Sequence, residues 1–300
     1  MTATTVPETA ARVATPRPGT HHDVLTLRCP QRSGIVNAVT SFLVDHGLDI
    51  TEHQQFDDQM SARLFLRTAF VGRSGPDLDE LRAGFAPIAD RYQMDARFYD
   101  QTPDRLLIMV SKLGHCLNDL IFRWRAGSLG AEIAVIVSNH ETHRPMADAA
   151  GLPFVHIPIT PETKPEAEAR LEALISEHHI DLVVLARYMQ VLSDGLCSRL
   201  DGWAINIHHS FLPSFKGAKP YHQAYARGVK MVGATAHYVT PELDEGPIIE
   251  QEIIRVDHTF DPDALATVGR DAEALALSRA VRWHSQRRVL RNGASTVVFR

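Results

Sequence analysis

Residues 22–100 alternate between two kinds of hydrophobic pattern. Apolar and polar residues alternate at 23–28, as in a strand with one buried face, and apolar side chains then recur at helical spacing at 35–43. The order βαββαβ predicts a ferredoxin-like unit, an antiparallel sheet with two helices on one face. The predicted elements are strands at 23–28, 48–55, 61–71 and 92–99, helices at 35–43 and 78–88, and a turn at Asp57-Asp58.

From residue 104 onward, short apolar runs alternate with helical patterns. Runs such as 106–110 and 182–186 have no polar face, which is typical of parallel strands buried on both faces. The alternation predicts a doubly wound α/β sheet, mainly parallel, whose sites lie at the carboxyl ends of its strands. The predicted elements are strands at 106–110, 133–137, 154–157, 182–186, 203–207, 233–239 and 247–256 and helices at 115–126, 166–179, 193–200 and 261–288, the last two strands forming a partly antiparallel pair.

Composition fits two domains and excludes several classes of function. The 300-residue chain is 44% hydrophobic and carries a net charge of −5 with scattered basic residues, which argues against a nucleic-acid surface. Three distant cysteines do not make a disulfide framework or a zinc ribbon. Without a signal peptide or a run of about 18 apolar residues, we expect a cytoplasmic protein without membrane contact. The predicted organisation is a disordered tail at 1–20, a small domain at 21–100 and a larger domain at 104–300.

Three polar residues are the candidates for chemistry. Asn206 and His208 lie two positions apart at the end of a predicted strand, so their side chains share one face. Asp244 lies in a later loop, from which its carboxylate can be aimed at that pair. An amide donor, an imidazole and a carboxylate base form a workable set for the attack of water on a carbonyl carbon. Alternatively, the Asn/His pair serves only to satisfy buried backbone groups.

Four phrases of the second domain carry a resemblance to a known family. Segment 105–300 resembles the formyltetrahydrofolate hydrolases and formyltransferases, and the unit at 22–100 looks like an ACT domain; together they resemble the formyltetrahydrofolate deformylases. The resemblance implies hydrolysis of 10-formyltetrahydrofolate to formate and tetrahydrofolate, in support of purine biosynthesis and one-carbon metabolism. Folate is then the substrate, and neither a cofactor nor a metal is needed. The phrases are INIHHSFLP (205–213), GAKPYHQAY (217–225), GATAHYV (233–239) and LDEGPII (243–249).

The resemblance also implies roles for individual residues. The catalytic Asn, His and Asp of the family fall on Asn206, His208 and Asp244. The phrase RYMQVL (187–192) matches the folate-binding strand end of the relatives. Loop residues Lys216, Lys219 and Tyr221 shape a lid, touch the glutamate tail of the folate, or are solvated surface. The residues expected beside the substrate are Arg187, Tyr188, Met189, Val191, Leu192, His209 and Gly246, the last by giving the loop of Asp244 its geometry.

The turn at 111–119 departs from the transferases of this family. Their Gly-Ser-rich turn cradles the phosphate of a nucleotide acceptor, because glycine lets the backbone approach closely. Here the turn reads SKLGHCLND, with one glycine flanked by Leu113 and His115. This sequence argues against a nucleotide acceptor and leaves water as the nucleophile, although Lys112 could offer a charge to some anion.

The resemblance of the first domain to ACT domains implies an amino-acid effector. Its turn contains Arg32, Ser33 and Gly34, where Gly34 leaves room for a ligand before the helix. Glycine and methionine are the effectors we expect, since both report on one-carbon supply. A purely structural dimerisation module is the alternative, and exposed edge strands favour a homo-oligomer in either case.

Three other functions remain open at this point. The chain could be a formyltransferase with an unidentified amine acceptor, a non-catalytic amino-acid-binding regulator that retains a folate pocket, or a metal hydrolase built on its histidines. His140 and His143 are weak metal candidates, because no cysteine or repeated carboxylate accompanies them. Release of formate without an acceptor would separate the first two from hydrolysis, and a chelator would test the third.

Overall fold

The protein divides into two compact units, Met1–Gln101 and Thr102–Arg300. The computed structural model describes residues 22–72, 77–212 and 220–300, so the predicted tail and the loop residues Lys216 and Lys219 lie outside the described part. Each unit has a hydrophobic core of its own. We therefore describe the two units separately.

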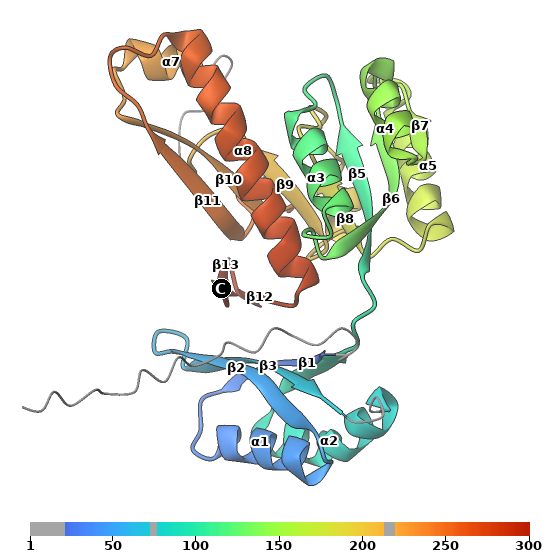
Figure 1. The fold of residues 1–300 in the computed structure, drawn as a ribbon, viewed down its shortest axis with the longest axis vertical. Coiled ribbons are helices and arrows are strands. Elements are labelled where there is room, and N and C mark those ends of the chain that lie inside the picture. Colours follow the sequence, from blue (N-terminus) through green and yellow to red (C-terminus); the bar gives the residue numbers. More distant parts are fainter. Residues whose placement is uncertain (1–21, 73–76, 213–219) are drawn as a thin grey trace, which may run out of the picture. The chain divides into compact units, whose positions relative to one another are not determined.

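The first unit is a four-stranded antiparallel sheet with both helices on one face (Figure 1). Ile35 and Val39 of one helix and Leu81 of the other meet Leu25 and Leu27 of the sheet in a single core. The strand order β2-β3-β1-β4 confirms the predicted ferredoxin-like fold. The elements are β1 (Asp23–Pro30), α1 (Ile35–Asp45), β2 (Asp49–Asp58), β3 (Arg63–Val71), α2 (Leu78–Tyr92) and β4 (Asp95–Tyr99).

The turn predicted at Asp57-Asp58 is wrong. Both residues belong to β2, where Asp57 pairs with Leu64 and Asp58 with Arg63. The chain reverses over the next four residues, and Asp58 supports that reversal by accepting a hydrogen bond from the backbone N–H of Met60 at 3.0 Å. Aspartate side chains favour turns by this kind of bond, so the pattern indicated the right chemistry a few positions too early.

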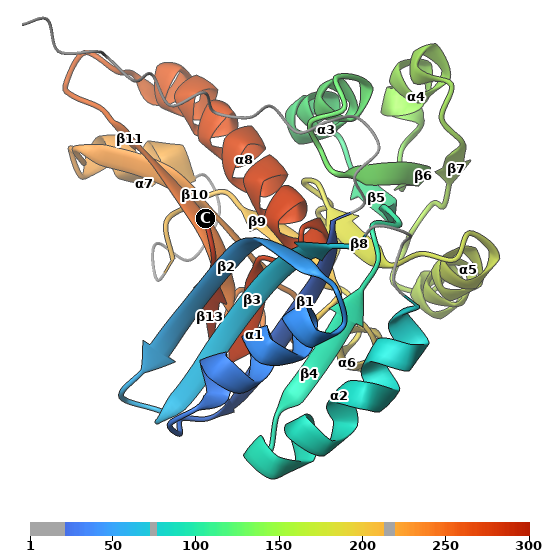
Figure 2. The same cartoon turned by 60° about the horizontal axis from the view of Figure 1, so that its bottom comes forward.

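The second unit is a seven-stranded sheet with helices on both faces (Figures 1 and 2). Its order is β11-β10-β9-β8-β5-β6-β7. Strands β5 to β9 run parallel to one another, whereas β10 is antiparallel to both of its neighbours, β9 and β11. Helices α3, α4 and α8 cover one face, and α5 and α6 cover the other. The predicted doubly wound, mainly parallel sheet is confirmed. The elements are β5 (Asp104–Val110), α3 (His115–Arg125), β6 (Ala131–Ser138), a 3₁₀ turn (Glu141–His143), α4 (Arg144–Ala150), β7 (Phe154–His156), α5 (Lys164–Glu177), β8 (Leu182–Leu185), α6 (Asp194–Arg199), β9 (Ala204–His208), α7 (Pro220–Ala226), β10 (Met231–Tyr238), β11 (Ile248–Arg255), α8 (Pro262–Ser285), β12 (Val289–Asn292) and β13 (Ser295–Val298).

The strand order reverses between β5 and β8, and this reversal positions the site. From β5 the chain proceeds to β6 and β7 on one side, and from β8 to β9 and β10 on the other. The carboxyl ends of parallel strands at such a switch point border a crevice. Arg187 follows β8, and His208 ends β9 at the same edge. No helix among the described residues is long and apolar enough to span a bilayer.

Candidate active site

Strand pairing brings Asn206 and His208 beside two side chains of β10. Asn206 lies opposite His237, and His208 lies opposite Thr235 in the antiparallel pair. Side chains at directly opposed positions of an antiparallel pair are neighbours on one face of the sheet. Ile205 and Ile207 point to the other face, where they join the core under α8. The i, i+2 geometry expected from the sequence is therefore present.

Both ring nitrogens of His208 have partners. Nδ1 lies 3.2 Å from Oδ2 of Asp244, and Nε2 lies 2.8 Å from Oγ of Ser210. The hydroxyl of Thr235 donates to the carbonyl of Ser210 at 3.0 Å and so holds the turn that presents Ser210. The imidazole is thus fixed between a carboxylate and a hydroxyl, which makes Asp244 the group that selects its tautomer and charge.

Asp244 reaches His208 from a loop with unusual backbone geometry. Its φ is 59°, in the left-handed region, which Asp tolerates better than most residues. Two residues later, Gly246 packs so closely on β10 that an added Cβ would lie 1.8 Å from the carbonyl oxygen of Tyr238. The hydrogen bond with His208 holds the pKa of the Asp244 carboxyl well below its usual value. Asp244 is therefore an anion beside the imidazole.

His237 is a member of this group that the sequence reasoning missed. Its Nδ1 lies 2.9 Å from the carbonyl oxygen of Tyr238, so Nδ1–H donates and Nε2 is left as an acceptor. The Asn206 amide nitrogen lies 3.2 Å from that Nε2, and Asp244 Oδ1 lies 3.7 Å from it. His237 is 2% exposed and fixes the orientation of the Asn206 carboxamide. The alternation in GATAHYV could have indicated it, because a histidine on the inward face of a buried strand needs a polar partner.

A cavity opens beside these side chains. It has a volume of about 220 Å³ and is partly open to solvent. Asn206, His208 and Asp244 line one side of it. Gly246 is not among the lining residues that the structure describes, and its role is the close packing on β10. The other predicted substrate-binding residues line the cavity as well, namely Arg187, Tyr188, Met189, Val191, Leu192 and His209.

The comparisons with known proteins agree with this geometry. A sequence model described as formyl transferase matches residues 104–281. A formyltetrahydrofolate deformylase of Corynebacterium sp. (strain P-1) is 57% identical over 279 residues, which are 92% of this chain and 98% of that protein. The chain belongs to the formyltetrahydrofolate deformylase family. The resemblance stated from the sequence motifs is thereby confirmed.

Solved structures separate this family from other proteins that share the fold. A formyltetrahydrofolate deformylase from Burkholderia mallei is 53% identical with a TM-score of 0.89, covering 93% of this chain and all of that one. A glycinamide ribonucleotide transformylase from Symbiobacterium toebii is 27% identical with a TM-score of 0.62, and it covers 68% of this chain and 97% of its own. The deformylase likeness extends over far more of the chain than the transferase likeness does.

Arg187 and His209 form the polar edge of the cavity in this deformylase-family chain. Arg187 has a φ of 63°, a left-handed conformation like that of Asp244. Burial, together with the charge of Arg187, lowers the pKa of His209 to about 4, so its imidazole is neutral near pH 7. The rings of His209 and His208 lie 4.8 Å apart between centroids. His209 is therefore a neutral neighbour that can contact a ligand without repelling a charged His208.

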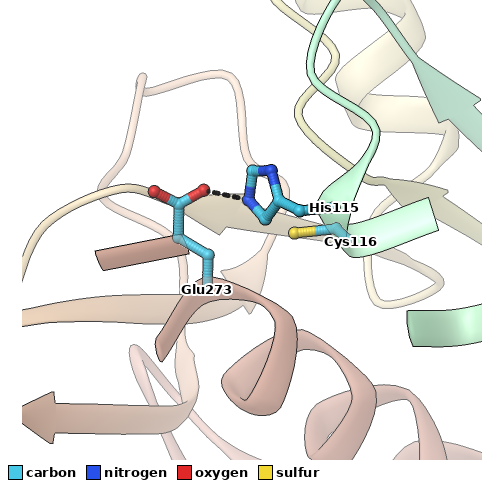
Figure 3. Close-up of side chains that lie close together, drawn as sticks. All are labelled: His115, Cys116 and Glu273. Carbon is cyan, nitrogen blue, oxygen red and sulfur yellow. Dashed lines mark hydrogen bonds and ion pairs between the residues drawn. The ribbon is translucent and has the colours of Figure 1, made fainter. Parts of the chain in front are cut away.

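A second polar cluster lies at the start of α3. His115, Cys116 and Glu273 place three potential metal-ligand atoms within 4.8 Å of one another (Figure 3). Glu273 already has a cation beside it, because Arg187 Nε lies 3.3 Å from its Oε2. Burial and the negative charge of Glu273 raise the pKa of the Cys116 thiol, which keeps the sulfur protonated. Since metal ligation needs a thiolate, this donor set fits an ion-pair network better than a metal centre.

The turn predicted to hold an effector lies at the start of α1. Gly34 has a φ of 91°, and a Cβ there would lie 3.1 Å from the Tyr92 hydroxyl. Arg32 donates to the side-chain oxygen of Gln93 at 2.8 Å. Arg32, Ser33 and Gly34 are exposed in this unit. Gly34 thus gives the turn its positive φ and lets the Tyr92 hydroxyl approach, and the effector role of the turn stays a prediction.

Proposed function

We propose that this protein hydrolyses 10-formyltetrahydrofolate to formate and tetrahydrofolate, as the names of its relatives state for them. The observation that carries the proposal is the contact of 3.2 Å between His208 Nδ1 and Asp244 Oδ2 at the edge of the cavity. Folate is bulky and largely planar, and the cavity edge at 187–192 combines apolar side chains with a backbone strand end. We assign substrate binding to this edge and to His209.

The reaction begins with attack of water on the formyl carbon. The carbon becomes tetrahedral and its oxygen becomes an oxyanion, which the Asn206 amide and a protonated His208 stabilise by hydrogen bonds. Because His208 Nε2 faces Ser210 at 2.8 Å, the formyl oxygen takes the position of that hydroxyl when substrate binds. Cleavage of the C–N bond then releases formate, and the folate nitrogen takes up a proton. Loss of one oxyanion donor typically costs about 10²–10³ in rate.

Asp244 is the base for water, and its low pKa is compatible with that role. A carboxyl held well below its usual pKa is a weak base while its imidazole partner is charged. When His208 gives its Nε2 proton to the oxyanion, that positive charge disappears and the carboxylate becomes more basic. Proton uptake by Asp244 is thereby coupled to proton donation by His208.

The decisive assay is incubation of the pure protein with 10-formyltetrahydrofolate and no amine. Stoichiometric formate and tetrahydrofolate are expected, and Asn206→Ala or His208→Ala abolishes most turnover while folding normally. The matched control is His258→Ala, an exposed histidine of the same unit. Formate that appears only after an amine is added would make the protein a formyltransferase instead, and full turnover by His208→Ala would remove that residue from the mechanism.

For the first unit we propose an amino-acid sensing role at Arg32, Ser33 and Gly34. Glycine and methionine are the ligands to titrate by calorimetry against the full chain. Gly34→Ala should weaken amino-acid binding, because Gly34 lies in the proposed effector turn. Gly47→Ala is the control: this glycine also has a positive φ but lies outside that turn, so binding should not change. Absence of heat with either amino acid would favour a structural module.

We also propose a homo-oligomer assembled through the first unit. Its sheet ends with β2 and β4, and most side chains of β2 are exposed or half-buried in the single chain. Unpaired strand edges are suited to pairing with a second copy. Sedimentation analysis of the full chain should give a multiple of its 33.3 kDa mass, and a monomer at all concentrations would contradict the proposal.

A further inference from the structure

The turn after β5 stands where doubly wound proteins often bind phosphate. It leads from Val110 into α3, whose first backbone N–H groups and positive dipole end face the carboxyl edge of the sheet. Arg187 lies at the neighbouring strand end and supplies a cation to the same region. On position alone, this corner of the fold is suited to an anionic co-substrate.

The inner side of that turn is filled by the protein itself. A Cβ on Gly114 would lie 2.4 Å from Cε1 of His143, so the glycine admits an imidazole ring rather than a ligand. His143 Nε2 lies 3.1 Å from the carbonyl oxygen of Lys112 and ties the ring to the turn. His143 is 9% exposed. The space beside Gly114 is therefore occupied, and a phosphate would have to approach the start of α3 from the side of Arg187 and Glu273.

The carboxylate of Glu273 contacts His115, the first residue of α3. Glu273, which is 1% exposed on α8, has its Oε2 2.7 Å from His115 Nε2 (Figure 3). Its Oε1 accepts a hydrogen bond from the Tyr221 hydroxyl at 3.0 Å, and Arg187 Nε lies 3.3 Å from Oε2. Glu273 thus joins α3, α7, α8 and the strand end after β8. Tyr221 reaches it because Gly269 of α8 leaves no side chain in the way: a Cβ there would lie 2.0 Å from the hydroxyl.

Glu273 carries a negative charge at neutral pH. Burial by itself would raise the pKa of its carboxyl, but the hydrogen bond from His115 and the charge of Arg187 lower it below the usual value. The carboxylate consequently neutralises Arg187, the cation that an incoming phosphate would need. It also opposes any second anion within a few ångströms, in surroundings where charges are poorly screened.

We propose that Glu273 is a specificity-determining residue that excludes anionic co-substrates from the start of α3 and so leaves water as the formyl acceptor. The proposal rests on the proposed hydrolysis and explains why water, rather than an anionic co-substrate, accepts the formyl group. Glu273 acts through His115 and Arg187 and touches no reacting atom. A phosphate-bearing amine, which a transferase of this fold would use, meets an internal carboxylate where its phosphate would bind.

The test is binding of inorganic phosphate and ribose 5-phosphate to the full-length protein, measured by calorimetry. Glu273→Gln keeps the size of the side chain, removes its charge and turns one of its two acceptor oxygens into a donor. We expect this variant to bind phosphate roughly tenfold or more tightly than the wild type, because the repulsion is gone and Arg187 is released. Adding Arg187→Gln to Glu273→Gln should abolish the gain. Glu250→Gln is the matched control, a carboxylate only 5% exposed whose arginine partners Arg279 and Arg300 lie elsewhere in the unit.

The outcomes are distinguishable from a failure of the hydrolase assignment, because phosphate binding is measured without turnover. Equal phosphate affinity in the wild type and Glu273→Gln, including no binding by either, would overturn the proposal. A gain that also appears in Glu250→Gln would do the same. If Glu273→Gln unfolds in plain buffer, Glu273→Met serves as a second variant. The thermal unfolding temperature of both variants is then measured with and without phosphate. Stabilisation by phosphate in these variants alone would support exclusion by the carboxylate.

Discussion

At the scale of single residues, the proposed chemistry depends on the pair formed by His208 and Asp244. The carboxylate lies 3.2 Å from Nδ1, and the opposite ring nitrogen is directed toward the position proposed for the substrate oxygen. The imidazolium form of His208 is the one that can donate a proton to an oxyanion, and an anion at Nδ1 attracts that positive charge. The same anion is also the proposed base, so it influences both proton movements.

Replacing Asp244 with asparagine should therefore cost more than the loss of a base alone. We expect Asp244→Asn to lower kcat by roughly 10²–10⁴, with little change in KM, because the shape of the loop is kept and the charge is lost. Steady-state formate release measures this effect. The control Asp201→Asn breaks an exposed ion pair with Arg291 in the same unit and should leave kcat unchanged. Wild-type turnover by Asp244→Asn would show that water needs no carboxylate here.

The hydroxyl of Ser210 permits a separate prediction about His208. If the substrate oxygen displaces this hydroxyl from Nε2, the hydroxyl makes no hydrogen bond to His208 in the transition state, and Ser210→Ala should keep kcat within about tenfold of wild type. A drop of about 10² or more would instead mean that Ser210 relays the proton. Single-turnover measurements on Ser210→Ala and on Ser198→Ala, an exposed serine of α6, would distinguish the two.

The sequence predicted some of the residues of the site but not others, and the difference has a physical cause. Asn206 and His208 could be paired from their i, i+2 spacing, because that relation is local. His237 comes from another strand, and only the register of β9 with β10 places it opposite Asn206. Glu273 lies 158 residues from His115, and no local pattern relates the two. The local sequence pattern therefore does not reveal contacts that tertiary packing makes between distant segments.

At the scale of elements, the loop between β10 and β11 delivers Asp244. Its close approach to β10 depends on Gly246, where a Cβ would lie 1.8 Å from the Tyr238 carbonyl oxygen, a backbone atom that cannot move aside. The loop geometry, rather than a contact with substrate, is what makes this glycine necessary.

Gly246→Ala should accordingly impair both folding and activity. We expect a loss of about 1–3 kcal/mol in the free energy of unfolding of the second unit, as for other overpacked sites, and a fall in kcat because Asp244 moves. Urea unfolding and formate release measure the two effects. Gly195→Ala in α6 is the matched control, since its nearest atoms lie at 3.4 Å or more and alanine favours a helix. Normal activity in Gly246→Ala would mean that the loop position tolerates the shift.

Element patterns predicted most of the sheet and helices but missed the last hairpin. The chain continues after α8 into β12 and β13, which pair from Val289–Val298 to Asn292–Ser295. The signal was present, because Asn292-Gly293 is a strong hairpin dipeptide and Gly293 has a φ of 62°. The flanking strands are only four residues long, too short to show a convincing alternation. Short elements such as α4 and α7 escaped prediction for the same reason.

At the scale of the whole molecule, each unit has its own core and so its own stability. In the second unit, α8 lies across the sheet, and the Tyr238 hydroxyl of β10 is hydrogen-bonded to Nδ1 of His284 at 2.8 Å. Burial, together with the nearby charge of Arg287, lowers the pKa of His284 to about 3. The folded protein therefore keeps this imidazole neutral at pH values where an unfolded chain would protonate it.

This difference predicts that the second unit loses stability in mild acid. The unfolded histidine titrates near pH 6.5, so between about pH 6.5 and 3 the unfolded state binds a proton that the folded state does not. The free energy of unfolding should fall by at most about 1.4 kcal/mol per pH unit across this range from His284 alone. His284→Gln still accepts from Tyr238 and cannot be protonated, so its urea-unfolding free energy should depend less steeply on pH. His258→Gln, at an exposed histidine, should keep the wild-type slope. Identical slopes in all three proteins would mean that His284 is protonated without cost in the folded state.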